Sequence, residues 1–480
     1  MKRTRLLALI ALSGFVLGTT CPPTTNNNNN NNSARNVQVD SEATARPADD
    51  PAICCEGSNV YVAWAERRTG PGYDILFARS ADGGATWTES PTLLNRDAPG
   101  ISDSRTPIIC CDGLNIYVVW LNGPDPVHMY FNSSADGGVT WRDFAVRISG
   151  STPTGFHSFP RICCMGTNVY VSWSDDRAGA GRPDMFFNRS TDGGTTWLQD
   201  DTRISSWAPG TDVGLTQHEM CCDGQNVYVS WSDRRNGDYD MWLTRSTDGG
   251  EMWPVMETRV DNGATGVNSG AASYEHSLCC SGQNIYVAWT DNRNAGGNAG
   301  ADVYLNASSD GGASFGGTDS RVNATDLASA GLLARNPNLC CTGTTVHATW
   351  RDNRAGANLQ VFYRRSTDGG TTFLVSDRRV DTGTGSVTSR PWICCDQTNV
   401  HITWYSSVGD QFINMSTDSG ASWLTTEANL DSNMPAAGTV TGGANYPMIC
   451  CNGATPYVVW RDDRNGTAGQ TFDIFFGRPN

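Results

Sequence analysis

The sequence predicts an all-β fold, an eight-bladed β-propeller built from four-stranded blades. A Cys-Cys pair followed by a short β-type run and a Trp recurs eight times, at intervals of 53 to 61 residues. Each repeat contains four short segments with the composition of strands, and no repeat has a sustained helical period. Four strands in a repeat of this length are the signature of a propeller blade.

The fourth repeat shows the expected elements in order. Its first strand contains Cys221 and Cys222, and a tight turn leads to a second strand at residues 227–231, which are mostly β-branched or aromatic. Residues 240–245 form the third predicted strand. After an Asp-Gly-Gly turn, the fourth strand ends at residues 258–261.

The last repeat stops after its third strand, at residues 472–478. Residues 36–40, before the first repeat, resemble the fourth-strand segment 259–261. We therefore expect the N-terminal strand to complete the eighth blade. This closure would join the two ends of the domain and remove exposed sheet edges.

The paired cysteines predict disulfides between neighbouring blades. Successive residues on a strand point to opposite faces, so one Cys of each pair points to the preceding blade and one to the following blade. We expect a ring of eight bonds, for example Cys55 with Cys110 or Cys54 with Cys111. Vicinal disulfides and a thiolate metal site are the alternatives. The pairs are Cys54–Cys55, Cys110–Cys111, Cys163–Cys164, Cys221–Cys222, Cys279–Cys280, Cys340–Cys341, Cys394–Cys395 and Cys450–Cys451.

Seven turns fit the pattern Ser-x-Asp-x-Gly-x-x-aromatic, with Asp82, Asp136, Asp192, Asp248, Asp310, Asp368 and Asp418 at the acidic position. This pattern resembles the Asp-box, the bacterial neuraminidase repeat of sialidase-like propellers, and the resemblance covers residues 36–480. It implies a structural role for each Asp, which would hydrogen-bond the backbone of a turn between the third and fourth strands. The box identifies a fold and does not by itself imply an activity.

The resemblance to sialidases also implies a catalytic set, which comprises three arginines, a Tyr–Glu nucleophile pair and an acidic acid/base residue. The first Arg of that family lies in a Phe/Tyr-Arg-Ile-Pro motif, which is absent from this sequence. The nearest approximations are Arg105, Arg335 and Arg390, each shortly before a Cys-Cys strand.

Two repeats break the common pattern in which Pro precedes the cysteines. The fourth has His218 and Glu219 there, and the fifth has Tyr274, Glu275 and His276. An Arg cluster opposite a Tyr/Glu group is able to bind an acidic sugar and attack it. Candidate catalytic residues are therefore Glu219, Tyr274 and Glu275. Candidate ligand-binding residues are Arg105, Arg335, Arg390, His218 and His276. The alternative is that these side chains only replace Pro in a hydrated loop.

An Asp-x-Arg pattern follows the Trp in most repeats, as in Asp233/Arg235 and Asp291/Arg293, and is lost in repeats two and seven. Its repetition favours a structural ion pair over a ligand site. Trp207 and Trp392, in long inter-blade segments, are expected either to stack on sugars or to pack internally.

Residues 1–20 have a basic start and a twelve-residue apolar run that is too short to span a bilayer, which is typical of a secretory signal. The following Cys21 resembles the lipid-attachment Cys of bacterial lipoproteins. Residues 21–35 would then be a polar, Asn-rich tether between the lipid and the domain at residues 36–480.

Net charge is −15, which argues against nucleic acid as a partner. We expect an exported, lipid-anchored monomer that binds a glycan or an extracellular protein at the bacterial cell envelope. Membrane contact would be limited to the lipid, and no cofactor or metal is expected. The alternative function is a glycoside hydrolase of the exo-sialidase type, so the question of enzymatic activity stays open at this stage.

Overall fold

A computed structural model shows the arrangement of the domain. It describes residues 35–40, 47–96 (except 69), 103–150 (except 124–126), 157–209 (except 180–182), 211–262 (except 212, 216 and 238), 275–324 (except 296–299), 327, 331–431 (except 357, 375 and 384), 447–463 and 472–479. The signal segment, Cys21, the tether up to residue 34, and Tyr274 lie outside these described residues.

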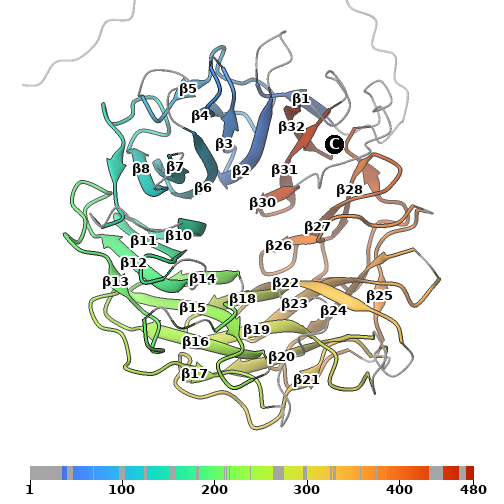
Figure 1. Ribbon diagram of the computed structural model, residues 1–480. Helices are drawn as coiled ribbons and strands as arrows, with labels where there is room; N and C mark the ends of the chain where they lie inside the picture. Colours follow the sequence, from blue (N-terminus) through green and yellow to red (C-terminus); the bar gives the residue numbers. More distant parts are fainter. Residues whose placement is uncertain are drawn as a thin grey trace, which may run out of the picture. The chain divides into compact units, whose positions relative to one another are not determined.

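The domain consists of eight four-stranded antiparallel sheets, and Figure 1 shows them around a common centre with the first strand of each sheet innermost. Seven sheets are formed by consecutive strands. The eighth is completed by the N-terminal strand β1, which pairs with the last strand β32. The predicted eight-bladed propeller and its N-terminal closure are therefore confirmed.

The strands of blades 1 to 4 are as follows. Blade 1 contains β2 (Ala48–Glu56), β3 (Asn59–Glu66), β4 (Asp74–Ser80) and β5 (Thr92–Leu93); blade 2 contains β6 (Ser104–Asp112), β7 (Asn115–Asn122), β8 (His128–Ser134) and β9 (Val146–Arg147). Blade 3 contains β10 (His157–Met165), β11 (Asn168–Asp175), β12 (Asp184–Ser190) and β13 (Thr202–Arg203); blade 4 contains β14 (His218–Asp223), β15 (Asn226–Asp233), β16 (Asp240–Ser246) and β17 (Thr258–Arg259).

The strands of blades 5 to 8 follow the same plan. Blade 5 contains β18 (His276–Ser281), β19 (Asn284–Asp291), β20 (Asp302–Ser308) and β21 (Ser320–Arg321); blade 6 contains β22 (Ala334–Thr342), β23 (Thr345–Asp352), β24 (Gln360–Ser366) and β25 (Arg378–Arg379). Blade 7 contains β26 (Trp392–Cys395), β27 (Val400–Tyr405), β28 (Gln411–Ser416) and β29 (Ala428–Asn429); blade 8 contains β30 (Met448–Asn452), β31 (Thr455–Asp462), β32 (Asp473–Arg478) and β1 (Arg35–Gln38).

The second strand of each blade is buried on both faces, because each sheet packs against a neighbour on either side. In β3, for example, every residue from Val60 to Glu66 is buried. This explains why these strands read as continuous apolar runs and do not alternate with polar residues. The Trp at the end of each run is at most 2% exposed. None of the described segments forms a helix with the length and hydropathy needed to cross a membrane.

Eight disulfides link the innermost strands of neighbouring blades into a closed ring. The first Cys of each pair bonds the second Cys of the next pair, with Cα–Cα distances of 5.9 to 6.2 Å, inside the usual range for a disulfide. The bonds are Cys54–Cys111, Cys110–Cys164, Cys163–Cys222, Cys221–Cys280, Cys279–Cys341, Cys340–Cys395, Cys394–Cys451 and Cys55–Cys450. The prediction of inter-blade disulfides is confirmed. Of the two pairings expected between blades 1 and 2, the structure contains Cys54–Cys111 and not Cys55–Cys110.

The seven Ser-x-Asp turns share two backbone hydrogen bonds, one to the Ser hydroxyl and one to the Asp carboxylate, and six of them add a Ser or Thr hydroxyl bond that Met252 lacks in blade 4. In the second blade, Asp136 accepts from the backbone N–H of Thr140 at 2.8 Å and from its hydroxyl at 2.6 Å, while Ser134 Oγ accepts from the N–H of Gly138. Bonds from Thr140 lower the pKa of Asp136 to about 2, so the carboxylate stays charged. Gly138 has φ +81°, and a Cβ there would lie 2.5 Å from the Phe77 ring of the preceding blade.

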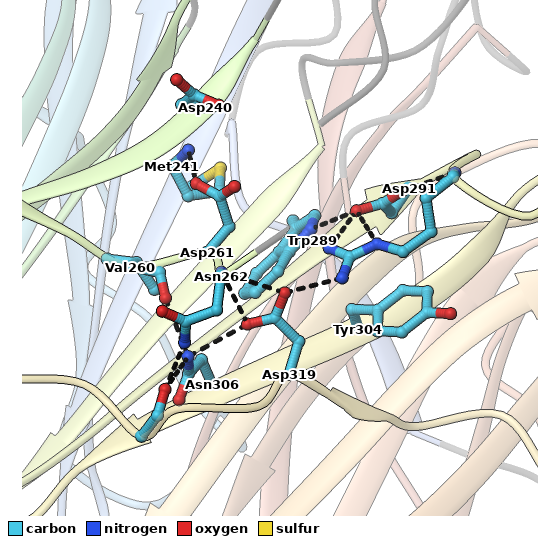
Figure 2. Close-up of polar contacts among 12 residues, drawn as sticks. Asp240, Met241, Val260, Asp261, Asn262, Trp289, Asp291, Tyr304, Asn306 and Asp319 are labelled. Atoms are coloured by element: carbon cyan, nitrogen blue, oxygen red, sulfur yellow. Dashed lines mark hydrogen bonds and ion pairs between the residues drawn. The ribbon is translucent and has the colours of Figure 1, made fainter. Parts of the chain in front are cut away.

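The Asp-x-Arg motif links neighbouring blades through ion pairs and hydrogen bonds, as Figure 2 shows for Asp291 and Asp319 of blade 5. Arg293 pairs with Asp291 in its own loop and with Asp319, at 2.7 Å, just before the fourth strand. Asp319 in turn accepts from the backbone N–H of Asn262 in blade 4 at 3.1 Å, and the guanidinium stacks on Tyr304. The structural ion pair expected from the sequence is therefore present.

Removal of one bond of the disulfide ring is predicted to destabilise the domain without changing its fold. The Cys110→Ser/Cys164→Ser variant frees a loop of sequence separation 54. The chain-entropy model then predicts a loss of up to about 4 kcal/mol in the free energy of unfolding. Denaturant unfolding measures the loss. Because the blades repeat, Cys279→Ser/Cys341→Ser should give a similar value, and an unchanged midpoint in both variants would contradict the prediction.

Candidate functional site

Four of the innermost strands begin with a bulge beside a Pro. In β2, β6, β10 and β22 the register shifts at the residue before Pro, and that residue has a positive φ of 51 to 55°. In β14 and β18 no Pro is present, and His218 and His276 continue the regular pairing with Trp231 and Trp289. The residues that break the repeat pattern therefore replace a bulge with straight strand.

Glu219 lies between two arginines that come from other blades. Arg161 of blade 3 donates from Nε to one carboxylate oxygen at 3.0 Å and from Nη2 to the other at 3.4 Å. Arg390 of blade 7 approaches the same carboxylate to 3.6 Å, and its Nη2 donates to the carbonyls of His276 and Pro337. One arginine thus connects blades 4, 5, 6 and 7.

The charges of this cluster remain partly open to solvent, with side-chain exposures of 17 to 23%. Burial alone would raise the pKa of Glu219, but Arg161 and Arg390 lower it to about 2. Glu219 is therefore a permanent anion at ordinary pH. Burial lowers the pKa of Arg390, and the nearby carboxylates of Glu219 and Glu275 oppose this effect.

His218 and His276 point between blades and are 0% and 2% exposed. Their Nε2 atoms lie 2.9 Å from Ser172 Oγ and 3.2 Å from Ser230 Oγ of the preceding blade. Burial lowers the pKa of His218 to about 3 and that of His276 to about 4, so both are neutral. Their placement is that of inter-blade packing residues.

Glu275 supports the bulge of the next blade. Its Oε2 accepts from the backbone N–H of Asn336, which has a positive φ, at 2.7 Å, and from the Thr290 hydroxyl at 3.2 Å. Asp50 accepts from Thr106 N–H at the corresponding bulge of blade 2, at 3.3 Å. The contact of Glu275 is therefore a variant of one that the fold uses elsewhere.

Arg335 and Arg351 are cross-strand partners in blade 6. Arg351 donates to the Asn336 side chain at 2.6 Å and to the carbonyls of Val387 and Thr388. Burial and the charge of Arg335 lower the pKa of Arg351 to about 10, although the carboxylate of Glu275 raises it in part. Within the described part of the chain, Arg335 has no carboxylate in ion-pair range, and its Nε has no hydrogen-bond partner.

We refer to Arg161, Glu219, Glu275, Arg335, Arg351 and Arg390 as the arginine–glutamate group. Four of these residues were candidates from the sequence. Arg161 and Arg351 were missed. Arg161 stands where two other repeats have Ala52 and Ile108, whereas an Arg directly after the Trp also occurs in the last repeat, as Arg461. Arg105 does not join the group among the described contacts, because it pairs with Asp103 at 2.9 Å and stacks on Tyr73.

Two further expectations concern aromatic residues and metals. Trp207 is 7% exposed and packs against Trp231, so it is a core residue. Trp392 is partly exposed and its ring lies 5.2 Å from the Arg390 guanidinium. Among the described residues, no group of three or more His, Cys, Asp or Glu side chains has an arrangement suited to a metal ion.

The sequence matches no family model. It also matches no curated protein.

Solved structures of carbohydrate-active propellers are similar to this chain at low identity. An α-L-arabinanase from Penicillium chrysogenum is 14% identical, with a TM-score of 0.42 over 68% of this chain and 93% of the other. The polysaccharide lyase Uly1 is 9% identical, with a TM-score of 0.46 over 89% of both chains. A Trypanosoma rangeli sialidase is 10% identical, with a TM-score of 0.40 over 81% of this chain and 56% of that one. At this level of similarity, none of them indicates what this chain binds or catalyses.

Glu219 is predicted to stabilise the domain as an anion. In the Glu219→Gln variant Arg161 and Arg390 lose their shared carboxylate, and the free energy of unfolding should fall by about 2 kcal/mol at pH 7. Because the pKa of Glu219 is lower in the folded state, its contribution is complete above the unfolded value near about 4 and is lost as the pH falls through about 2. Unfolding curves of both proteins should converge at low pH, and a constant difference down to pH 2 would contradict this assignment.

Proposed function

We propose that this protein is an exported binding module for an acidic glycan, with the arginine–glutamate group as its anion site. The observation that carries the proposal is the placement of Arg335 beside Arg351 without a carboxylate partner among the described residues. Guanidinium groups bind carboxylates in a planar, bidentate manner. An unpaired arginine next to a second one is therefore suited to a sugar carboxylate.

Charge balance supports an anionic ligand at this place. The group contains four arginines and two glutamates, whereas the whole chain has a net charge of −15. In an acidic protein, a local excess of positive charge is the place where an anionic ligand is attracted most strongly. Both glutamates are already engaged, Glu219 by two arginines and Glu275 by the Asn336 N–H, so the excess charge lies with Arg335 and Arg351.

The partly exposed Trp392 ring supports a sugar as the bearer of the carboxylate. Ligand sites combine apolar or aromatic surface with a few polar groups that fix orientation. Trp392 offers such a surface beside the cation of Arg390.

Binding is favoured over hydrolysis by the state of the candidate catalytic groups. A glycosidase needs one carboxyl group as a proton donor and a second as nucleophile or base. Among the candidate catalytic residues, Glu219 is held as an anion by its arginines and is therefore not available as the proton donor. His218 and His276, which were ligand-binding candidates, are buried and neutral, so they offer no charge to an acidic sugar.

The location that we propose is the bacterial cell envelope. Eight disulfides are typical of an exported protein. Attachment of a lipid at Cys21, after removal of residues 1–20, would anchor the monomeric propeller to a membrane and place it among envelope glycans.

The test is binding of the oxidised protein to acidic oligosaccharides and to their neutral counterparts, combined with an assay for turnover. Arg335→Ala should weaken binding of the acidic sugars about tenfold or more, because one charge-assisted contact is lost. It should leave stability unchanged or slightly higher, because Arg335 repels Arg351. Arg378→Ala is the matched control, since it removes an exposed charge from an outermost strand.

Equal binding of acidic and neutral sugars, or an unaffected Arg335→Ala variant, would refute the anion site. Turnover of a bound sugar, lost in a Glu275→Gln variant that still folds, would establish the glycoside hydrolase alternative.

A further inference from the structure

In blades 3 to 6 an arginine occupies the same place between acidic side chains and an aromatic ring. The guanidinium carbon lies 3.9 to 4.2 Å from the ring centroid of the third-strand aromatic residue. The acidic residue just before the fourth strand forms an ion pair with this arginine, and its side chain is only 1 to 5% exposed. Figure 2 shows one of these places, with Asp319 and Tyr304. The arginines are Arg177, Arg235, Arg293 and Arg354.

Blade 7 keeps the surroundings of this arginine but not the arginine itself. Val408 stands four residues after Trp404, at the position of Arg354 in blade 6, and Ser406 replaces the Asp of the motif. The aromatic ring is still present as Phe412, and the acidic residue is still present as Glu427. Blade 2 keeps the aromatic ring as Tyr130 but has Ala145 at the acidic position.

A cavity of about 220 Å³ lies at this place in blade 7. Trp404, Ser406, Val408, Phe412, Asp381 and Glu427 are among the residues that line it. The volume is below the range of roughly 300–1,000 Å³ typical of sites for drug-sized ligands, and suits a single side-chain group.

Glu427 supplies a charge that the described residues do not balance. Its Oε2 accepts from the backbone N–H of Thr382 in blade 6 at 2.9 Å, as Asp319 accepts from Asn262. No arginine pairs with it within the described part of the chain. Asp381, in contrast, is already paired with Arg379 at 2.9 Å.

We infer that the cavity of blade 7 binds a guanidinium group supplied by a ligand. The group would stack on Phe412 and donate to Glu427, as the internal arginines do in blades 3 to 6. The planar cation is weakly hydrated and combines stacking with bidentate hydrogen bonds, which an ammonium group cannot reproduce. This site takes a cation and is independent of the anion site proposed above.

The experiment is isothermal titration of the oxidised full chain with N-acetyl-arginine methylamide and with agmatine. Saturable binding of either compound at one site is the expected result. The matching lysine derivative should bind more weakly, and the citrulline derivative, which has the same shape without the charge, should not bind. Tighter binding of the capped arginine would assign the site to an arginine of a polypeptide. Tighter binding of agmatine would assign it to a small guanidino compound.

Two variants locate the site. Glu427→Gln should weaken binding about tenfold or more, since it removes the charge and keeps an acceptor for Thr382. Val408→Arg should abolish binding by placing an internal guanidinium in the cavity, whereas Val408→Gln should reduce binding less. Val408 is 59% exposed, so both of its variants are expected to fold.

Binding of the citrulline derivative as strong as that of the arginine derivative would overturn the inference. The inference would also be overturned if Glu427→Gln and Val408→Arg both bound the arginine derivative as tightly as the wild-type protein does, or if the wild-type protein bound none of the compounds.

Discussion

Each innermost strand is bonded covalently to both of its neighbours, and the tolerance of this fold to sequence change depends on that constraint. Since disulfides hold the strands at Cα–Cα distances near 6 Å, the residue two positions before the first cysteine can vary in chemical type from blade to blade. The same position is therefore occupied by Ala52 in one blade and by Arg161 or Glu219 in others. Polar groups can accumulate on one side of the ring because the disulfides already join the blades there, and the contacts of Glu219 with Arg161 and Arg390 add to that cohesion.

Arginine is the only basic residue besides histidine after position 2, since the single lysine of the chain is Lys2. The contacts explain this preference. The guanidinium groups of Arg235 and Arg293 stack on an aromatic ring while bonding two carboxylates, a combination of planar geometry and several donors that lysine does not have. Several positive charges of the domain therefore act as connectors between blades.

Features that repeat were predictable from the sequence, whereas contacts across the ring were not. The repeat period predicted the blade count, the missing fourth strand of the last repeat predicted closure by residues 36–40, and strand alternation predicted the inter-blade direction of the disulfides. The choice between Cys54 and Cys55 as the partner of blade 2 required the handedness of the ring. Glu219 was recognised as a departure from the repeat and Arg390 as an approximation of the sialidase arginine motif, but no local signal predicts that the two side chains meet. Arg105 carries the same Arg-x-Pro signal as Arg335, yet Asp103 and Tyr73 bind it locally.

The pairing of β1 with β32 places Arg35 opposite Arg478 in one antiparallel ladder. Two strand ends in that position are separated by no more than the span of a hairpin turn. A short peptide linker could therefore connect residue 478 to residue 35, and new chain ends could be opened in a segment between any two blades. Such circular permutants would keep every sheet and every disulfide, so the folded ring does not require that synthesis start at one particular blade.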